Sequence, residues 1–412
     1  MTGHRVAITG IGAVTPIGHG AAGLWRGVRR GMSAVGPVTR FDASPFRSRL
    51  AAEIDGFDPS RYLDAKRARR LDRFSQFATV ASIQAVEDAS LDDDETWRET
   101  TGAYVGSALG GVAFAEEQHR AFAQHGLAGV SPALALAVFG GAAPSNVAID
   151  LRLRGPSLSN ANSCASGAIA IGEAFRLVRD GRAPIMLAGG VEAPLAPLTY
   201  GAFAIIKAMS AANECPELAS RPFDAARDGF VMGEGAAMLV LEDLERARAR
   251  GARVYAEIRG YGTTNDAHNM IAPLADGREA ARAISLALAD SAVRPAEIDY
   301  VNAHASATQV GDRAEAAAIR LALGEYGARV PVSGTKGLYG HPLGASGAIE
   351  AAICALALTH GFVPGTANRV ETDPTIELNV IGSAGLERPI TTVLKNAFGF
   401  GGINAALVIS AA

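Results

Sequence analysis

The chain has 412 residues, of which 49% are hydrophobic and 19% are charged, so it is long and apolar enough to form a large core in two or three domains. Its net charge of −4 is too close to neutral to favour nucleic acid or an anionic membrane as a partner. Its three cysteines, at positions 164, 215 and 354, fit neither a disulfide framework nor a zinc site and instead indicate a reducing compartment.

Neither the first residues nor the later hydropathy gives a sign of targeting or of membrane insertion. Residues 1–10 reach turn residues too early for the apolar region of a signal peptide, and no later stretch looks long and uncharged enough to cross a bilayer. We therefore expect a cytoplasmic protein.

Strand-like and helix-like segments alternate along the chain. In the first half, one strand is expected to end at residues 8–12, and further strands are expected at 102–106, 185–189 and 235–240. Helices are expected at 73–89 and 167–179. In the second half, strands are expected at 254–262, 298–303 and 404–409, with an apolar helix at 345–358. This alternation predicts an α/β protein with helix-covered sheets.

Three short sequence echoes occur in the same order in both halves. Each half begins with a strand that ends in Gly-x-Gly, at 10–12 and at 260–262. The pentapeptide Ala-Ser-Gly-Ala-Ile occurs at 165–169 and again at 345–349, and similar apolar strands occur at 235–240 and 404–409. Single matches are common in a chain rich in Ala and Gly, but three in one order indicate an internal duplication.

The duplication predicts a layered sandwich of two similar halves, residues 1–253 and 254–412. Both helices that begin with the repeated pentapeptide are apolar almost all round, so they would lie between sheets rather than on the surface. The spacing between the first two echoes is longer in the first half, so insertions are expected around residues 20–75 and 110–145. We expect these insertions to form a cap or a partner surface.

Cys164 stands where a polar stretch, residues 160–163, turns directly into an apolar helical pattern. The free N–H groups and the positive dipole end of a helix start favour thiolate over thiol, so Cys164 is a candidate nucleophile. The alternative is a buried structural thiol, but the small residues beside Cys164 would let a thioester approach. Cys215, in a loop, and Cys354, inside an apolar helix, are expected to be structural.

Two histidines stand in marked contexts. His304 follows a strand pattern, and open α/β sheets place ligands at strand C-termini, although an ordinary loop histidine is the alternative. His341 precedes the second copy of the pentapeptide, just as Cys164 precedes the first. Near two-fold symmetry would bring His341 and Cys164 to one cleft, which predicts a Cys-His-His thioester site.

Neighbouring residues could support this chemistry. Lys336 and Glu350 flank His341, and a lysine held by a carboxylate could fix an imidazole, whereas an ordinary surface ion pair is the alternative. The glycines on both sides of Phe400 could present backbone N–H groups as an oxyanion hole rather than form a plain turn. The Gly-x-Gly pair at 10–12 lacks the third glycine of a dinucleotide motif, and the basic run at 66–70 is too short for nucleic acid.

Taken as a set, the motifs resemble those of the β-ketoacyl-acyl-carrier-protein synthases of the thiolase fold, specifically the type II elongation group, over essentially the whole chain. The motifs are Arg-Pro-Phe-Asp at 221–224, Arg-Asp-Gly-Phe at 227–230, Gly-Glu-Gly at 233–235, Asp-Ala-His at 266–268, Asn-Ala-His at 302–304, Gly-Asp at 311–312, Thr-Lys at 335–336, Gly-His at 340–341, Leu-Gly at 343–344, and Asn396 with 398–402. The resemblance implies a homodimer of duplicated five-layer αβαβα subunits.

The resemblance also implies roles for single residues. Cys164 would accept the acyl group and His304 and His341 would decarboxylate the malonyl thioester, with Lys336, Glu350 and Phe400 as further catalytic residues. The implied substrate-binding residues are Leu109, Phe203, His268, Ser306, Thr308, Phe398, Gly401 and Gly402. The basic residues implied to dock the acyl carrier protein are Lys66, Arg69, Arg70 and Lys207. No metal or cofactor is implied beyond the phosphopantetheine of the carrier.

Two loops depart from the family pattern. The family usually has His-Gly-Thr-x-Thr where this chain has His-Ala-Ser-Ala-Thr at 304–308, and Ser-Thr-Lys-Ser-Met-Thr-Gly-His where this chain has Ser-Gly-Thr-Lys-Gly-Leu-Tyr-Gly-His at 333–341. Ala305 removes the freedom of glycine, and Tyr339 is expected to add bulk next to the site. Ser306 and Thr308 can still bond a pantetheine arm, so the departures concern substrate choice more than reaction type.

We therefore expect a ping-pong, decarboxylative Claisen condensation of malonyl carrier protein with an acyl chain on Cys164, in fatty acid-type elongation. The two loops leave open a ketosynthase of a specialised type II polyketide or polyene system, which could pair with a chain-length-factor subunit. A non-catalytic partner subunit is a further alternative, which the intact Cys164, His304 and His341 argue against. A thiolase-like or chalcone-synthase-like enzyme is disfavoured, because a second histidine occupies the other catalytic position.

Overall fold

One continuous β-sheet runs through the structure, and its strand order repeats. The computed structural model describes residues 3–91 and 95–412, so residues 1–2 of the N-terminal segment discussed above lie outside the described residues. The order is β1-β9-β7-β5-β6 in the first half and β10-β17-β16-β11-β12 in the second half, where the short β14 follows. The two halves join where β1 pairs with β10.

The bounds of these strands are β1 (Val6–Thr15), β5 (Gly102–Gly106), β6 (Ser157–Asn160), β7 (Ile185–Glu192), β9 (Gly235–Asp243), β10 (Ala256–Asn265), β11 (Tyr300–Asn302), β12 (Pro331–Ser333), β14 (Asn379–Val380), β16 (Thr392–Gly399) and β17 (Ile403–Ser410). The strand directions repeat as well. β9 is antiparallel to both its neighbours, β1 and β7, and β5 is parallel to β7 and β6. β17 and β11 have the same relations in the second half, which confirms the predicted duplication.

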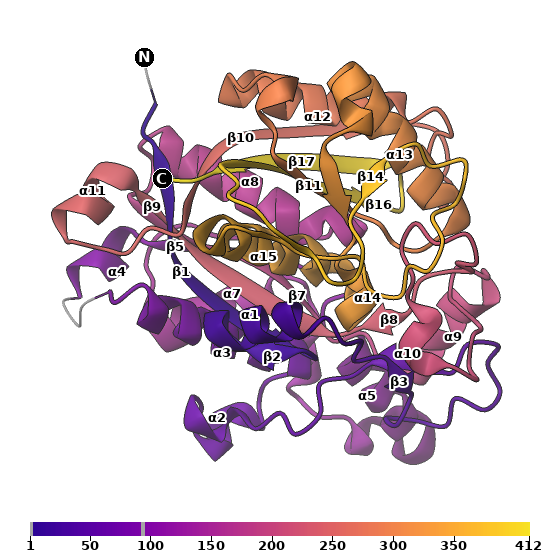
Figure 1. The fold of residues 1–412 in the computed structure, drawn as a ribbon. Helices are drawn as coiled ribbons and strands as arrows, with labels where there is room; N and C mark the ends of the chain where they lie inside the picture. The colour runs from indigo at the N-terminus through magenta and orange to yellow at the C-terminus, as the bar shows by residue number, and fades with distance from the viewer. Residues whose placement is uncertain (1–2, 92–94) are drawn as a thin grey trace.

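Helices form three layers around the two halves of the sheet (Figure 1). α3 (Arg73–Asp88) and α7 (Ala142–Leu151) cover the outer face of the first half, and α12 (Arg278–Ser291) and α13 (Gln309–Leu323) cover that of the second. α8 (Ser166–Arg179) and α15 (Ser346–His360) lie between the two halves and contact each other. This is the expected five-layer αβαβα sandwich of the thiolase fold.

The repeated motifs are places where these layers approach closely. A Cβ atom at Gly12 of β1 would lie 1.8 Å from the Ala81 carbonyl oxygen of α3, and one at Gly262 of β10 would lie 2.2 Å from that of Ala283 in α12. Each Gly-x-Gly therefore lets a strand contact its covering helix directly.

The repeated pentapeptide acts in the same way between the two central helices. A Cβ atom at Gly167 of α8 would lie 2.9 Å from the Ala348 nitrogen, and one at Gly347 of α15 would lie 2.6 Å from the Ala168 nitrogen. The starts of α8 and α15 therefore lie against each other, which places the segments that precede them side by side.

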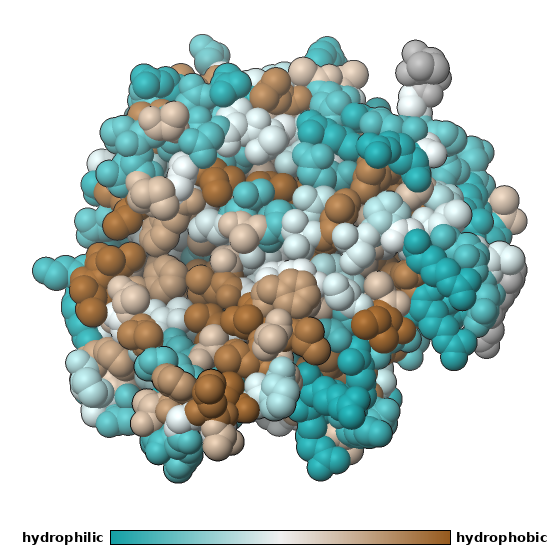
Figure 2. All heavy atoms as spheres, turned by 180° about the vertical axis from the view of Figure 1, so that it is seen from behind, coloured by the Kyte–Doolittle hydropathy of each residue, from teal (hydrophilic) through white to brown (hydrophobic). Residues whose placement is uncertain are grey.

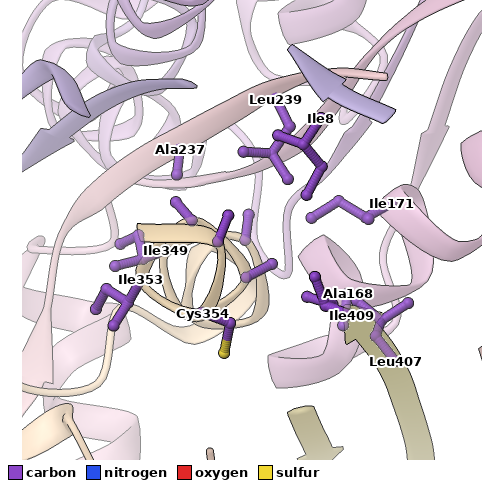
Figure 3. Packing of buried hydrophobic residues seen from close by; sticks show 14 of the residues in the cluster. Ile8, Ala168, Ile171, Ala237, Leu239, Ile349, Ile353, Cys354, Leu407 and Ile409 are labelled. Carbon is purple, nitrogen blue, oxygen red and sulfur yellow. The ribbon is translucent and has the colours of Figure 1, made fainter. Parts of the chain in front are cut away.

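A single large core surrounds the central helices. Apolar side chains from both halves of the sheet meet α8 and α15 there, including Ile8, Ile171, Leu239, Ile349, Ile353, Leu407 and Ile409 (Figure 3). Burial of one such side chain stabilises the fold by about 1.5–3 kcal/mol. Because α15 is buried from Ser346 to Leu358, it needs the apolar composition that the sequence shows all round.

The predicted insertions contain helices and short strands. Residues 20–75 contain α1 (Gly20–Arg30), β3 (Gly36–Pro37), β4 (Leu50–Ala52), η1 (Pro59–Arg61) and α2 (Ala65–Ala68), and residues 110–145 contain α5 (Val112–His125), η2 (Gly126–Gly129) and α6 (Leu134–Ala137). The remaining elements are β2 (Gly18–His19), α4 (Thr96–Thr100), η3 (Ser163–Ala165), α9 (Pro197–Ile205), α10 (Pro216–Ala219), β8 (Met232–Gly233), α11 (Leu244–Ala249), η4 (Pro295–Glu297), η5 (Gly324–Ala328), α14 (Lys336–Tyr339), η6 (Leu343–Ala345), β13 (Phe362–Val363) and β15 (Leu386–Glu387).

One described stretch, Leu343–His360, is long and apolar enough to cross a membrane by length and composition. The expectation that no stretch would meet this test is therefore wrong. In the structure 89% of the stretch is buried inside the protein, because it forms η6 and the central helix α15.

Candidate active site

Cys164 and both predicted histidines line one cavity. The cavity has a volume of about 470 Å³, and Cys164, His304 and His341 are between 3% and 8% exposed. Cys164 lies in η3, directly before α8, and His341 lies two residues before η6, which α15 follows. The contact between the two helix starts therefore brings Cys164 and His341 together, as the duplication predicts.

Both imidazoles are held with Nδ1 facing a donor. The His304 and His341 ring centroids are 5.3 Å apart and the ring planes are 79° apart. Nδ1 of His341 is 2.8 Å from the Ser346 hydroxyl, and Nδ1 of His304 is 3.5 Å from Nζ of Lys336. An ammonium group only donates, so Nδ1 of His304 accepts and the His304 proton belongs on Nε2. The Ser346 hydroxyl can donate to Nδ1 of His341, and this bond places the His341 proton on Nε2 as well.

The histidines are neutral at physiological pH. Burial lowers the pKa of His304 and of His341 well below 6.5, and the charge of Lys336 acts in the same direction. Two neutral imidazoles with Nε2–H groups are suited to donate to one oxygen that becomes negative during a reaction.

The Cys164 thiol is protonated in this structure. Burial raises the pKa of Cys164 to about 11, while the Ser163 hydroxyl, the Lys336 charge and the Phe400 N–H act in the opposite direction. The expectation that the helix start would favour thiolate is therefore not met, because the burial of Cys164 outweighs it. Cys164 must lose its proton during acyl transfer.

The glycine-rich segment lies where an oxyanion hole requires it. The Phe400 N–H lies close enough to the Cys164 sulfur to lower the pKa of the thiol, and a Cβ atom at Gly399 would lie 3.0 Å from the Cys164 nitrogen. The end of β16 therefore lies against the start of η3, and a thioester carbonyl on Cys164 would lie close to both backbone N–H groups.

Lys336 and Glu350 form a buried pair behind His304, not a surface ion pair. Nζ of Lys336 donates to the His304 carbonyl oxygen and to Glu350 Oε1. Both side chains are fully enclosed. Lys336 therefore fixes the backbone and the Nδ1 side of the His304 ring.

Three buried charged residues at the site were missed by the sequence reasoning. Glu192, at the end of β7, accepts hydrogen bonds from the N–H groups of Ala108, Leu109 and Gly344, and burial raises its pKa to about 7. It ties the loop of Leu109 to the loop after His341.

The other two are Glu315 and Lys395. Glu315 of α13 accepts from the N–H groups of His304 and Ala305, both at 2.7 Å, and Lys395 of β16 pairs with Glu350 at 2.6 Å. The sequence could have indicated two of these residues. Glu192 and Lys395 each lie in an apolar strand, and such a strand carries a charged residue only where the fold provides a partner for it.

Most of the other predicted substrate residues line the cavity, but two do not. Leu109, Phe203, Ser306, Thr308, Phe398 and Gly402 are lining residues. The Thr308 hydroxyl also caps α13 by accepting from the Gly311 N–H, and it lies 3.0 Å from that of Ser306. His268 is exposed and Gly401 is half-buried, and neither lines the cavity, so the structure does not bring these two to the site.

The four basic residues predicted to dock a carrier are all exposed. Lys207 lines the cavity, whereas Lys66, Arg69 and Arg70 lie in or beside α2, outside the cavity lining. No ion pair involves any of them within residues 3–91 and 95–412. Arg67, by contrast, is tied to Asp150 at 2.8 Å.

The two unusual loops are explained by packing. Tyr339 is fully buried, its hydroxyl lies 2.8 Å from that of Thr335, and it does not line the cavity, so the expectation of added bulk next to the site is wrong. Ala305 has a φ of 42°, a left-handed conformation that favours glycine. A Cβ atom at Gly334 would lie 2.6 Å from that of Ala305, so the methyl group occupies space that Gly334 leaves free.

Within the described chain, no group of three or more His, Cys, Asp and Glu side chains is arranged to hold a metal ion.

Comparisons with known proteins give a consistent answer. Residues 3–247 match the description "Beta-ketoacyl synthase, N-terminal domain", and residues 255–369 match "Beta-ketoacyl synthase, C-terminal domain". The chain is 43% identical over 403 residues to 3-oxoacyl-acyl-carrier-protein synthase 2 of Synechocystis sp., covering 98% of this chain and 97% of that protein. It is 41% identical over 404 residues to the protein of the same name from Staphylococcus aureus, with the same coverage.

Solved structures agree in fold. A type II polyketide ketosynthase in complex with its acyl-carrier protein superimposes with a TM-score of 0.93 at 32% identity, covering 100% of both chains. The ishigamide ketosynthase/chain length factor gives 0.93 at 34%, again covering 100% of both, and a β-ketoacyl synthase from Burkholderia phymatum gives 0.93 at 35%, covering 99% of this chain and 100% of that one. Since both domain descriptions match and curated relatives align along almost the whole chain, this protein belongs to the β-ketoacyl synthase family of condensing acyltransferases.

Proposed function

We propose that this protein is a β-ketoacyl-acyl-carrier-protein synthase of fatty acid-type elongation, in which Cys164 carries the growing acyl chain. One observation carries the proposal. Cys164 lines one cavity with two neutral histidines, and Nδ1 of His304 faces Lys336 while Nδ1 of His341 faces Ser346. A cysteine can hold an acyl group, and two Nε2–H donors can stabilise an enolate oxygen.

In the first step, the Cys164 thiol exchanges with the thioester of an acyl carrier protein. The new bond joins the Cys164 sulfur to the acyl carbon, and the bond from that carbon to the pantetheine sulfur breaks. The thiol proton leaves with the free pantetheine thiol, so the step is balanced. The N–H groups of Cys164 and Phe400 stabilise the tetrahedral oxyanion, and one such donor contributes about 3–4 kcal/mol to the transition state.

In the second step, malonyl carrier protein replaces the first carrier. Its carboxylate leaves as CO₂, and the electron pair moves to the thioester, whose oxygen accepts from Nε2–H of His304 and of His341. The resulting carbanion attacks the acyl carbon on Cys164 and expels the Cys164 sulfur, which takes up one proton. The product is a 3-oxoacyl chain on the carrier, two carbons longer.

The phosphopantetheine arm of the carrier is the only prosthetic group in this proposal, and it arrives with each substrate. Ser306 and Thr308 line the cavity, and their hydroxyl groups can form hydrogen bonds with the amides of the pantetheine arm. Leu109 and Phe203 line it with apolar surface for the acyl chain, and Phe398 lies beside His304 with ring centroids 6.1 Å apart. Gly402 is the lining residue beyond Phe400.

The test is an assay of purified protein with acyl and malonyl carrier proteins of several chain lengths, with mass spectrometry of the enzyme and product. Cys164→Ala should abolish both the acyl-enzyme adduct and condensation, while Cys215→Ala, a matched control at an exposed cysteine, should keep both. His304→Ala and His341→Ala should keep the Cys164 adduct but lose CO₂ release. Condensation by Cys164→Ala with an adduct on another cysteine would refute the assignment.

Carrier docking is proposed for Lys66, Arg69, Arg70 and Lys207. Their exposure and the absence of ion pairs to them within the described chain leave their charges free for an acidic partner, whose association they would accelerate in a salt-dependent way. The double variant Arg69→Glu/Arg70→Glu should raise KM for a carrier-bound substrate but not for a small thioester mimic. Arg182→Glu, another exposed arginine, is the control. Equal effects on both substrates would contradict docking.

A homodimer is also part of the proposal. The edge strand β6 pairs on one side with β5 and is exposed, and apolar side chains of the 110–145 insertion and of α7 are exposed as well, with Leu127 at 82%, Leu136 at 72% and Ile149 at 66%. Apolar surface gathers over the lower half of the face opposite to that of Figure 1 (Figure 2). Such surface supports a partner. Sedimentation of Leu136→Glu should show monomers where the native protein shows dimers.

A second candidate function is that of a ketosynthase in a specialised type II polyketide or polyene system. The observation that favours it is the likeness to the polyketide ketosynthase and to the ishigamide ketosynthase/chain length factor. In that case the partner would be a non-identical chain-length-factor subunit, and the protein alone would not elongate. Robust elongation by the purified homodimer would favour the first proposal.

We further propose that the division of labour follows the duplication. Residues 1–253 would supply the nucleophile together with the cap and dimer insertions, and residues 254–412 would supply both histidines. A cytoplasmic location fits the three unpaired cysteines, since such thiols persist in a reducing compartment.

A further inference from the structure

A second buried lysine lies at the site and has no role in the mechanism above. Lys395 is on β16 and has no exposed surface, and its Nζ lies 2.6 Å from Oε2 of Glu350. Lys336 occupies Oε1 of the same carboxylate. The chain has four lysines, at 66, 207, 336 and 395, and two of the four therefore share one buried glutamate.

The burial of a lysine at position 395 needs a specific reason, because it lowers stability unless the lysine has a partner. A lysine without a partner in an apolar strand costs several kcal/mol, and a serine or an apolar residue would avoid this cost. Burial lowers the pKa of Lys395, and the Glu350 charge opposes this effect. Glu350 therefore favours the charged form of Lys395, and the two oxygens of the Glu350 carboxylate each face one lysine.

The contacts of Lys395 extend around His304 from both sides. Nζ of Lys395 also donates to the carbonyl oxygen of Asn396 at 2.5 Å, and Nδ2 of Asn396 donates to Glu315 at 3.2 Å. Glu315 accepts the N–H of His304, and Lys336 donates to the His304 carbonyl oxygen. Lys395 thus links the two groups that hold the His304 backbone.

The buried acids and bases beneath the imidazoles are equal in number only with Lys395 present. Lys336 and Lys395 are the two bases, and Glu350 and Glu315 are the two acids. The other titratable groups that face this cluster are Tyr300 of β11, Tyr339 of α14, Cys354 of α15, His341 and Cys164, whose charged forms burial disfavours, and Glu192 of β7, which faces Cys164 and whose pKa burial raises to about 7. Removal of Lys395 would leave Lys336 as the only base of this group, and the effect by which the Lys395 charge lowers the pKa of His304 and of His341 would be lost.

We propose that Lys395 is a positioning residue for condensation: it holds Glu350, and through it Lys336, against His304, and it keeps His304 and His341 as neutral hydrogen-bond donors in mildly acidic solution. This inference rests on the proposed function. It assigns Lys395 no contact with substrate.

The test is the pH dependence of malonyl decarboxylation in Lys395→Met, measured as CO₂ release. A lost positive charge makes protonation of the nearby imidazoles easier, so the acid limb of the rate profile should move up by about one pH unit. At a given pH on the acid limb, CO₂ release by the variant should be about tenfold slower than by the native protein, because one pH unit corresponds to a factor of ten. The rate of Cys164 acylation by an acyl carrier should change less than about twofold.

Two further variants separate charge from packing. Lys395→Arg keeps the positive charge, so its acid limb should remain near that of the native protein even if the bulkier side chain lowers stability. Lys395→Gln is neutral but can still donate to Glu350, and it replaces Lys395→Met if that variant does not fold. A lower melting temperature with an unchanged acid limb in the neutral variant would show a merely structural role and overturn the proposal.

A measurement on the native protein needs no variant. Lysine-selective ¹⁵N labelling gives four Nζ resonances, and the proposal requires Lys395 to be an ammonium group at pH 7. A neutral amine there overturns it. Histidine ¹⁵N shifts report the titration of His304 and His341 directly, so the inference stays testable even if the protein decarboxylates no malonyl carrier and the proposed function fails.

Discussion

The pairing of Ala305 with Gly334 gives a prediction whose size follows from the structure. In Gly334→Ala the new Cβ atom would lie 2.6 Å from the Cβ of Ala305 and 2.8 Å from that of Pro222, against 3.4–4 Å for ordinary contact. Neither neighbour has a flexible side chain that could move aside. We therefore expect a loss of about 1–3 kcal/mol in the free energy of unfolding, the usual cost of overpacking.

The partner substitution, Ala305→Gly, should be nearly neutral by itself. Ala305 has a φ of 42°, and a left-handed conformation costs a non-glycine residue about 1–2 kcal/mol. Glycine relieves this strain but loses about 0.5–1 kcal/mol more in chain entropy on folding. These two effects act in opposite directions, so the net change should be within about 1 kcal/mol.

The double variant should recover much of what Gly334→Ala loses, because removal of the Ala305 methyl leaves only the Pro222 contact. We expect a coupling of about 1–2 kcal/mol in favour of the double variant, within the range for residues in contact. This would also explain both departures from the family pattern together, since the family has Gly and Ser at these two positions.

The assay is equilibrium denaturation in urea for the native protein, both single variants and the double variant, at one fixed protein concentration because a dimer's stability depends on it. The rate of malonyl decarboxylation is the second readout, because Ala305 directly follows His304 and donates to Glu315 at 2.7 Å. Additive effects, with a coupling below about 0.5 kcal/mol, would refute the steric reasoning.

Three further predictions concern the cavity. Ser346→Ala removes the hydroxyl 2.8 Å from Nδ1 of His341. Decarboxylation should then slow by roughly tenfold or more, while Cys164 acylation continues. An unchanged decarboxylation rate would mean that the hydroxyl does not select the His341 tautomer. Because the pKa of Cys164 is about 11, its alkylation by iodoacetamide should accelerate roughly tenfold per pH unit between pH 7 and 9. An alkylation rate that is already constant near pH 7 would instead show that Cys164 is a thiolate there. Leu109 lines the cavity, so Leu109→Ala should accept longer acyl chains and Leu109→Phe shorter ones, at similar stability. Chain-length profiles equal to that of the native protein in both variants would show that Leu109 does not line the acyl pocket.

The duplicated architecture and the central chemistry could be read from the sequence. The pentapeptide copies at 165–169 and 345–349 begin α8 and α15, and their glycines form the close contact between these helices. Cys164 and His341 are both adjacent to this contact, so one repeat predicts both the fold's symmetry and a shared cleft. Such information is local, because period, small residues and helix starts are properties of neighbouring residues.

The environment of these residues was decided by the tertiary structure. The sequence context of Cys164 favoured a thiolate, but burial raises the pKa of the thiol to about 11. The motif with His268 pointed to substrate, but His268 is exposed and outside the cavity lining. Desolvation and cavity shape depend on every layer of the sandwich, and neither is a property of one motif.

The partners of the buried charges were also beyond the sequence. Lys395 of β16 meets Glu350 of α15 although the two are 45 positions apart in the chain, and Glu192 meets the Gly344 N–H although these two are 152 positions apart. A charged residue in an apolar strand shows that some partner must exist, because burial without one costs several kcal/mol. Which residue that partner is depends on how the layers pack, and only the folded chain determines it.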